Sequence, residues 1–163
     1  MRSMRLKQRE VSDERGLRAI MDACATVRIA AVDEDGPFIV PMSFGYEWED
    51  GAELPTIWLH GSGRGRKAAA FAMEGAVVAF EMDVADGLIE GPHACDYSMA
   101  YRSIMGTGRI EAVASGEDKV YGLDFIMERT APGAPCAYGP GIIDRTSVWR
   151  LEVEKMTGKR HER

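Results

Sequence analysis

Several stretches of the chain place an apolar residue at every second position. Val27, Ile29 and Ala31 share one face of such a stretch, and from Phe38 to Tyr46 every second residue is large and apolar. A period of two places these side chains on one face of a β-strand. The same reasoning predicts six strands in all, at about residues 27–32, 38–46, 56–59, 77–82, 103–114 and 149–153.

Other stretches have helical spacing. Leu17, Ile20, Met21 and Cys24 would line one face of a helix over about residues 12–23, with Ser12 as its N-cap. An alanine-rich helix is predicted at about 65–74, and a third helix begins after the capping sequence at Ser115 and runs to about residue 128.

The connections between the predicted strands indicate the fold class. Residues 33–37 contain Asp-Gly, a strong hairpin signal, and a second turn is expected at 49–51. Pro41 has no backbone N–H to donate, so its strand should lie at an edge or be unpaired there. Strands joined by turns favour a mainly β fold, a six-stranded antiparallel split β-barrel with attached helices, over a doubly wound sheet.

The remaining segments complete the expected organisation. Residues 1–163 should form a single domain in which 1–10 are a flexible arm. Two segments, 83–102 and 130–147, show little periodicity and are expected to be long irregular loops. Long loops in compact domains often line a site or a subunit contact.

Composition excludes several classes of protein. The net charge of −6 argues against general binding of nucleic acid, and no apolar run approaches the ~20 residues of a membrane helix. The basic N-terminus lacks the apolar stretch of a secretory signal. The three cysteines are widely spaced and form neither a disulfide framework nor a metal knuckle, which favours a reduced, cytoplasmic protein.

The segment from His60 to Lys67 carries the most specific chemistry. Three glycines allow the backbone N–H groups to face a ligand, and Arg64, Arg66 and Lys67 concentrate positive charge in an acidic chain. The N-terminus of the following helix also favours an anion, so the segment predicts a phosphate-binding loop. The segment does not match a P-loop, which needs Gly at position 66 and Ser or Thr at position 68, where this chain has Arg66 and Ala68. A dinucleotide-binding fingerprint is interrupted by Arg66 if it starts at Gly61 and by Ala68 if it starts at Gly63. A solvated basic turn is the alternative interpretation.

Few other residues suggest chemistry. His60, at the end of a strand, is either a site residue or a ring packed by its neighbours, and an imidazole can titrate near neutral pH. A metal site at His93 and Cys95 would need at least one more ligand, for which Asp96 is a weak candidate, so an ordinary loop is expected there and no metal is predicted. Cys24 is expected to be buried, Cys136 to be exposed, and Trp149 to lie in the core or an interface.

Four ordered stretches resemble one protein family. They are 40–46 (VPMSFGY), 58–67 (WLHGSGRGRK), 101–110 (YRSIMGTGRI) and 149–153 (WRLEV), followed by Thr157-Gly158-Lys159. Together, over roughly residues 5–160, they resemble the pyridoxamine 5′-phosphate oxidase-related FMN-binding split-barrel superfamily, and within it the Nim branch of nitroimidazole resistance-type flavoproteins. The substrate-binding C-terminal pattern of pyridoxamine oxidase is not recognisable, so vitamin B6 oxidation is not expected.

The resemblance implies a cofactor, a partner and a set of site residues. It implies FMN in a cleft between the subunits of a homodimer, with Lys67 and Arg66 on the phosphate. Pro41, Met42 and Ser43 would run along the flavin ring, and Arg102 and Ser103 would add polar contacts. Leu59, His60 and Gly61 would approach the ring or ribityl chain, with His60 as the candidate catalytic residue.

The implied activity is that of a flavin-dependent oxidoreductase. NAD(P)H would bind in the flavin cleft, and electrons would pass to a small organic acceptor such as a nitroaromatic or quinone-like compound. Three alternatives remain open: a flavin carrier or sensor without catalytic activity, a haem-binding member of the same fold, and a deazaflavin-binding member.

Overall fold

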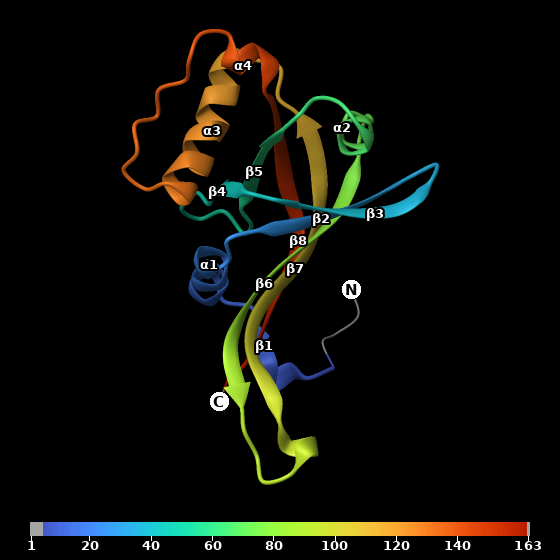
Figure 1. Ribbon diagram of the computed structural model, residues 1–163, viewed down its shortest axis with the longest axis vertical. Coiled ribbons are helices and arrows are strands. Elements are labelled where there is room, and N and C mark those ends of the chain that lie inside the picture. The colour runs from blue at the N-terminus through green and yellow to red at the C-terminus, as the bar shows by residue number, and fades with distance from the viewer. Residues whose placement is uncertain (1–4, 163) are drawn as a thin grey trace.

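A computed structural model of the chain describes residues 5–162. Its elements form one sheet with most of the helices at one end and one helix beside the middle of the sheet (Figure 1). The strands are β1 (Glu10–Val11), β2 (Val27–Asp33), β3 (Gly36–Met42), β4 (Phe44–Glu47), β5 (Thr56–Gly61), β6 (Val77–Ile89), β7 (Ser98–Ala112) and β8 (Ser147–His161). The helices are α1 (Glu14–Ala23), α2 (Arg66–Phe71), α3 (Gly116–Thr130) and α4 (Ile142–Arg145), with short 3-10 turns at Lys7–Arg9 and Ala94–Asp96.

All strand pairs are antiparallel, and the sheet has the order β3-β2-β6-β7-β8-β5-β4, with β1 also pairing with β8. The open, strongly curved sheet confirms the mainly β split-barrel class. The prediction of six strands was too low. The expected strand 38–46 breaks at Ser43 into β3 and β4, and β1 forms within the expected N-terminal arm, of which residues 1–4 lie outside the described part of the chain.

The barrel core follows the predicted alternation. Val27, Ile29 and Ala31 are buried on β2, whereas Val32 on the opposite face is 70% exposed. β3 lies at one edge of the sheet, as the proline at position 41 requires. The helical spacing of α1 was also read correctly, because Leu17, Ile20, Met21 and Cys24 are all buried against the barrel.

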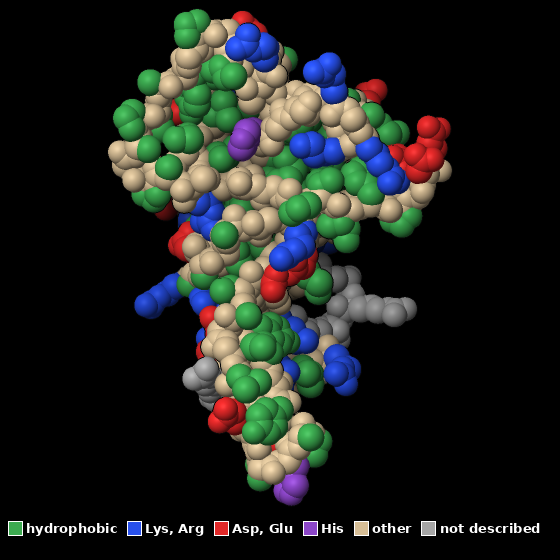
Figure 2. Space-filling view, in the orientation of Figure 1, with side chains coloured by type: hydrophobic (Ala, Val, Ile, Leu, Met, Phe, Trp, Pro, Cys, Tyr) green, Lys and Arg blue, Asp and Glu red, His purple; other side chains and the backbone are tan. Residues whose placement is uncertain are grey.

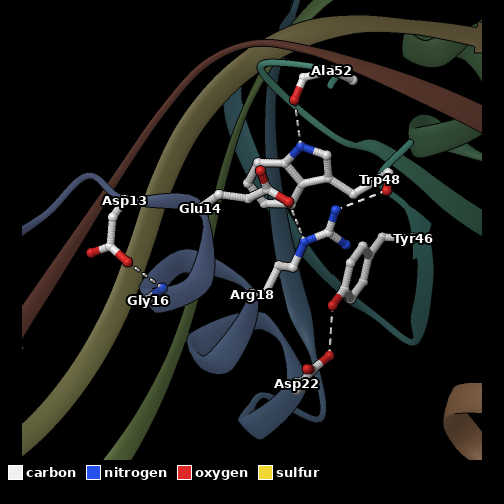
Figure 3. Close-up of polar contacts among 8 residues, drawn as sticks. All are labelled: Asp13, Glu14, Gly16, Arg18, Asp22, Tyr46, Trp48 and Ala52. Carbon is white, nitrogen blue, oxygen red and sulfur yellow. Dashed lines mark hydrogen bonds and ion pairs between the residues drawn. The ribbon is translucent and has the colours of Figure 1, made fainter. Parts of the chain in front are cut away.

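The N-cap of the first helix lies one residue later than the cap predicted at Ser12. Asp13 is the N-cap, and its Oδ1 accepts a hydrogen bond of 2.9 Å from the Gly16 backbone N–H (Figure 3). Serine and aspartate are both good N-caps, so adjacent candidates could not be separated by residue type alone. In α3 the predicted cap is confirmed, because Ser115 Oγ accepts from the Asp118 N–H.

The segment 83–102 is not the irregular loop that its sequence suggested. β6 continues to Ile89 and β7 begins at Ser98, so the two strands form a long hairpin that projects from the barrel (Figure 1). Both faces of this arm are largely exposed, and hydrophobic side chains are visible on its surface (Figure 2). Leu88, Tyr97 and Met99 are among the exposed hydrophobic residues of the arm. Because this arm buries neither face, its residues do not alternate between apolar and polar, and the sequence pattern did not indicate the strands.

A second, smaller core lies on the outer face of β4, β5 and β8. There α3 packs against Trp58 and Val148, and Gly122 of α3 allows its close approach to the Trp58 ring. The other expected loop, 130–147, includes the single turn α4. No helix among residues 5–162 combines the length and the hydropathy that crossing a bilayer requires.

Candidate functional site

The glycine-rich loop lies between the end of β5 at Gly61 and the start of α2 at Arg66. Gly65 has φ of 95°, a left-handed conformation that a side chain would strain, and this turn sends the chain into the helix. The helix ends at Phe71 and not near residue 74 as predicted, since a turn at Met73–Gly75 follows it. So short a helix contributes little dipole, and anion binding must depend on the side chains of the loop.

Lys67 is the cation that the loop positions most closely. Its Nζ lies beside Gly61, where a Cβ would come within 2.5 Å of the nitrogen, and 5.0 Å from the centroid of the buried Trp149 ring. Partial burial lowers the pKa of the Lys67 ammonium. The ion pairs found among residues 5–162 do not include Lys67. Its charge is therefore available to an anion.

The second loop glycine faces β8. A Cβ on Gly63 would collide with the Ser147 hydroxyl, and Ser147 in turn pairs with Gly61 across the strands. Glycine at positions 61 and 63 therefore keeps the loop close to β8 and leaves room for the lysine. The hydroxyl of Ser147 lies at the same end of the sheet as a further polar group.

Arg66 makes contacts different from those that the resemblance implied. Its Nε and Nη2 donate to the two Asp33 carboxylate oxygens at 2.7 and 2.6 Å, and Nη2 also donates to the Gly36 carbonyl at 2.9 Å. The guanidinium lies 4.5 Å from the centroid of the Phe38 ring. These contacts tie the start of α2 to the β2–β3 turn and already use the side of the guanidinium that would grip a phosphate.

His60 and Leu59 lie on opposite faces of β5. Leu59 is fully buried in the barrel core, so only its backbone could meet a ligand. His60 pairs with Val148, which belongs to the core beneath α3, so its ring points to that outer face. Desolvation, and secondly the Lys67 charge, lowers the pKa of the imidazole and favours its neutral form near pH 7.

Pro41, Met42 and Ser43 lie at the far end of the β2–β3 hairpin. Met42 is buried and pairs with Val27, whereas Pro41 and Ser43 are exposed. Met42 lies six positions along β3 from Gly36, which accepts a hydrogen bond from Arg66, and this corresponds to about 20 Å along the strand. The chain continues from Ser43 into β4, where Phe44 pairs with Leu59, so Ser43 lies beside the end of β5 that enters the phosphate loop.

Arg102 and Ser103 are remote from the loop. Arg102 donates from Nε and Nη2 to both carboxylate oxygens of Asp86, each at 2.8 Å. Arg102 lies ten positions before Ala112 on β7. Ala112 pairs with Trp149, the residue whose ring lies beside Lys67. These ten positions correspond to roughly 30 Å along β7. The structure therefore gathers the expected residues 59–61, 66 and 67 at one end of the barrel, with Ser43 beside β5, and leaves Arg102 and Ser103 elsewhere.

Sequence reasoning missed the partners of the charged residues. Trp149, correctly expected to be buried, also lies against Lys67, and Asp33 was read only as turn chemistry. Arg66 and Asp33 are 33 positions apart in the sequence, so no local spacing pairs them. Only the predicted turn at 33–37, which places Asp33 at the tip of a hairpin, could have indicated its pairing with Arg66.

The segment of His93, Cys95 and Asp96 forms a small turn at the tip of the arm. The Asp96 carboxylate lies 3.1 Å from His93 Nδ1 and accepts a bond from the His93 backbone. Across residues 5–162 no group of three or more His, Cys, Asp or Glu side chains is arranged to hold a metal ion.

Comparison with solved structures identifies proteins of the same fold. A candidate 5-nitroimidazole antibiotic resistance protein from Bacteroides thetaiotaomicron is 27% identical, with a TM-score of 0.78 over 93% of this chain and 86% of the other. The FAD and haem binding protein from Mycobacterium smegmatis is 23% identical, with a TM-score of 0.82 over 95% and 74% of the two chains. The flavocytochrome Anf3 from Azotobacter vinelandii is 23% identical, with a TM-score of 0.80 over 99% and 73%.

No curated protein matches the chain. The family model described as pyridoxamine 5′-phosphate oxidase matches residues 13–160, which includes the glycine-rich loop, Lys67 and the closing strand β8. The match covers nearly the whole chain and agrees with the split-barrel topology. The chain therefore belongs to the pyridoxamine 5′-phosphate oxidase family.

Proposed function

We propose that the chain binds a flavin, FMN, with the flavin phosphate on Lys67. The observation that carries this proposal is the Lys67 ammonium itself, which is partly buried between Gly61 and Trp149 and takes part in none of the ion pairs of residues 5–162. A phosphate beside it would offset the cost of desolvating the charge and would raise the lowered pKa again. Relatives of the same fold include FAD- and haem-binding proteins, which supports a flavin as the phosphate-bearing ligand.

The residues around Lys67 fit such a group. The cradle exists because positions 61 and 63 carry no Cβ, and the loop leaves its Ser62 and Arg64 side chains exposed. Arg66 would act mainly by anchoring the loop through Asp33, and Lys67 would make the charged contact. Charge-assisted hydrogen bonds of this kind are among the stronger polar contacts in proteins.

The separation of the expected site residues supports a homodimer with the flavin at its interface. Arg102 lies about 30 Å along β7 from Ala112, which pairs with Trp149 next to Lys67. A single chain therefore cannot bring Arg102 and Lys67 to the same ligand. A second copy could present its own Arg102 and Ser103 to the loop of the first. Arg66 is already paired with Asp33 and Arg102 with Asp86, and these ion pairs would hold both guanidinium groups in place at such an interface.

One face of the sheet suits this association. Cross-strand pairing aligns Ile39 with Ala30, then Ala79 and Thr107, so the outer faces of β3, β2, β6 and β7 form one surface. Large apolar side chains on this surface are exposed: Val32 at 70%, Ile39 at 66%, Val77 at 56% and Met105 at 60%. These side chains form an apolar patch bordered by the ion pairs of Arg28 with Glu81 and Asp83, and an exposed apolar patch of this kind marks an association site.

We infer a redox role from this assignment. When bound, the flavin would supply the hydride and electron transfer, with NAD(P)H as donor and a small organic acceptor such as a nitroaromatic. The nitroaromatic acceptor is suggested by the 27% identical nitroimidazole-resistance candidate. The His60 ring lies on the outer face of β5, opposite Lys67, and its neutral imidazole would donate a hydrogen bond only to a group bound on that side, so we assign it no proton transfer to the acceptor.

The absorption spectrum and the released ligand test the assignment. Flavin bands and a ligand with the mass of FMN support it, whereas the mass of FAD or of a deazaflavin would correct the cofactor. A Soret band without flavin absorption would instead indicate a haem protein. Oxidation of NADH or NADPH that requires a nitroaromatic acceptor distinguishes a reductase from a flavin carrier, which would bind flavin without turnover.

Light scattering tests the dimer. The Ile39→Glu variant should shift the protein toward the monomer and weaken flavin binding, because it places a charge in the proposed interface. The Met73→Glu variant is the control, since Met73 is similarly exposed, at 62%, but lies on the turn after α2. A flavin-saturated monomer of the unaltered protein would contradict the shared site.

A further inference from the structure

A hollow of about 560 Å³ lies between α3 and the outer face of β4, β5 and β8. A second hollow of about 600 Å³ adjoins it, and the two share Glu47, Glu49 and Tyr121. Volumes of a few hundred Å³ are typical of sites for small molecules. We call the first hollow the α3 groove; the residues that define its chemistry are Glu47, Glu49, Trp58, Glu111, Asp118 and Tyr121.

The α3 groove is separate from the phosphate loop. Trp149, which lies against Lys67, and Arg150, which lines the groove, are neighbours on β8 and therefore face opposite sides of the sheet. The same alternation puts Leu59 in the barrel and Trp58 beneath α3. A ligand in the groove would thus lie across the sheet from the proposed flavin phosphate.

The groove has an excess of negative charge. Four carboxylates line it, at positions 47, 49, 111 and 118, and the lining includes one cation, Arg150. That guanidinium is already held by two carboxylates, 3.4 Å from Glu111 and 3.0 Å from Glu152. In the adjoining hollow, Arg18 is held by Glu14 and by the Trp48 carbonyl (Figure 3). The other cation of that hollow, Arg129, lies 3.6 Å from the Asp22 carboxylate. Each cation that lines the two hollows is therefore paired with a carboxylate, whereas several of the lining carboxylates have no cation partner among residues 5–162.

Glu47 is fixed in place by two aromatic side chains. Its Oε1 accepts a hydrogen bond of 3.2 Å from Trp58 Nε1, and its Oε2 accepts one of 2.6 Å from the Tyr121 hydroxyl. The carboxylate raises the pKa of that hydroxyl, which keeps it protonated as a donor. Each carboxylate oxygen can accept a further bond, so Glu47 is oriented and still able to take a donor from a ligand.

The Tyr121 ring offers a π-face at the junction of the two hollows. It makes edge contacts with Trp58, at 5.8 Å between ring centroids, and with Phe125, at 5.2 Å. Although the ring is held on two sides, Tyr121 remains 51% exposed. An exposed aromatic face next to an oriented carboxylate is the combination that binds an ammonium group, through cation–π attraction and a charge-assisted hydrogen bond.

We propose that the α3 groove binds a small organic cation, an aliphatic amine of the polyamine class. One ammonium group lies against the Tyr121 ring and Glu47. The chain of a polyamine carries its next ammonium toward Glu49 or into the adjoining hollow, which shares these side chains. The charges and the length of such a ligand match two connected hollows with separated carboxylates better than a compact monocation does. This inference does not depend on flavin binding.

Isothermal titration with spermidine at low ionic strength tests the proposal. We expect saturable binding to the unaltered protein that weakens as sodium chloride is added, because salt screens partly exposed charges. The Glu47→Gln and Tyr121→Ala variants should each lose about three- to thirtyfold in affinity. Circular dichroism and thermal melts of each variant establish that the fold is intact.

Matched variants separate the groove from nonspecific charge effects. Tyr121→Phe keeps the ring and should retain most of the affinity, and Glu74→Gln removes an exposed carboxylate outside the groove and should bind like the unaltered protein. Lys67→Ala should also bind spermidine normally, since Lys67 lies across the sheet. No saturable binding, or equal binding by Glu47→Gln and the unaltered protein, would overturn the proposal.

Discussion

The Arg66 guanidinium and the Asp33 carboxylate form a two-bond ion pair, with distances of 2.7 and 2.6 Å. The side-chain hydrogen bonds raise the pKa of Arg66 and lower that of Asp33. The pair connects the first residue of α2 to the end of β2, so the position of the glycine-rich loop depends on the β2–β3 hairpin. This contact separates the roles of the two adjacent cations, Arg66 as an anchor and Lys67 as the anion ligand.

The anchoring role makes a prediction about Asp33. If Arg66 acts through Asp33, then Asp33→Asn and Arg66→Gln should weaken FMN binding to a similar and moderate degree, and the double variant should be no worse than either single one. The interaction energy from the double-mutant cycle, measured by flavin fluorescence titration, tests this relationship. A loss at Arg66→Gln that is much larger than at Asp33→Asn would mean that Arg66 itself holds the phosphate.

The contact between Gly61 and Lys67 makes a second prediction. A methyl group at position 61 would meet the lysine nitrogen at 2.5 Å, and the flexible end of the lysine would move away. Gly61→Ala should therefore lower FMN affinity while the melting temperature changes little. Gly139→Ala is the control, because no atom lies within 4 Å of the Cβ it would add. Unchanged FMN affinity in Gly61→Ala would show that the lysine need not occupy this position.

Arg129, in the last turn of α3, should be a major determinant of stability. Its Nη2 donates to the carbonyls of Met21 and Cys24 at the end of α1, and its guanidinium lies 4.2 Å from the Phe44 ring centroid. Arg129→Met leaves these carbonyls without their donor and should cost about 2–4 kcal/mol in the free energy of unfolding.

Chemical denaturation measures this loss. Arg129→Lys keeps the charge but not the planar fork, and should lie between the unaltered protein and Arg129→Met. Arg15→Ala, on the exposed side of α1, is the control. A cost below about 0.5 kcal/mol in Arg129→Met would place it among ordinary surface substitutions.

His60 should make the stability depend on pH. Its pKa in the fold is lowered from 6.5, first by desolvation and then by Lys67, so just below pH 6.5 the unfolded chain takes up a proton that the folded chain does not. The stabilisation is complete above pH 6.5 and declines as the pH falls through the lowered pKa. Denaturation midpoints of the unaltered protein and of His60→Asn, compared between pH 7.5 and pH 5.5, should diverge, with the larger acid loss in the unaltered protein. Parallel curves would contradict this assignment.

Much of the fold could be predicted because its buried faces leave a pattern in the sequence. β2 and α1 each bury one face, so period two and helical spacing identified them. The outer half of the β6–β7 hairpin buries neither face, and nothing in its order of residues distinguished it from a loop. The break at Ser43 was missed because the alternation continues through it from β3 into β4.

The candidate site could be predicted only where it is local. The glycines and Lys67 lie within seven residues of one another, so the loop was apparent from residue types alone. The pairing of Arg66 with Asp33 and of Arg102 with Asp86 depends on strands that meet in three dimensions. The resemblance grouped 41–43 and 102–103 with the loop. The pairing of Phe44 with Leu59 brings the first segment beside β5 within one chain, whereas Arg102 lies roughly 30 Å away along β7, and that separation is the reason a second copy is proposed.

Titration of FMN into the apoprotein tests the central claim most directly. Lys67→Ala should bind FMN about ten- to a hundredfold more weakly than the unaltered protein, since it removes a charge-assisted contact of ~1.5–3 kcal/mol. Lys7→Ala, which removes an exposed lysine of the N-terminal 3-10 turn, should bind FMN normally. Equal FMN affinities for the unaltered protein and the folded Lys67→Ala variant would contradict the assignment of Lys67 to the flavin phosphate.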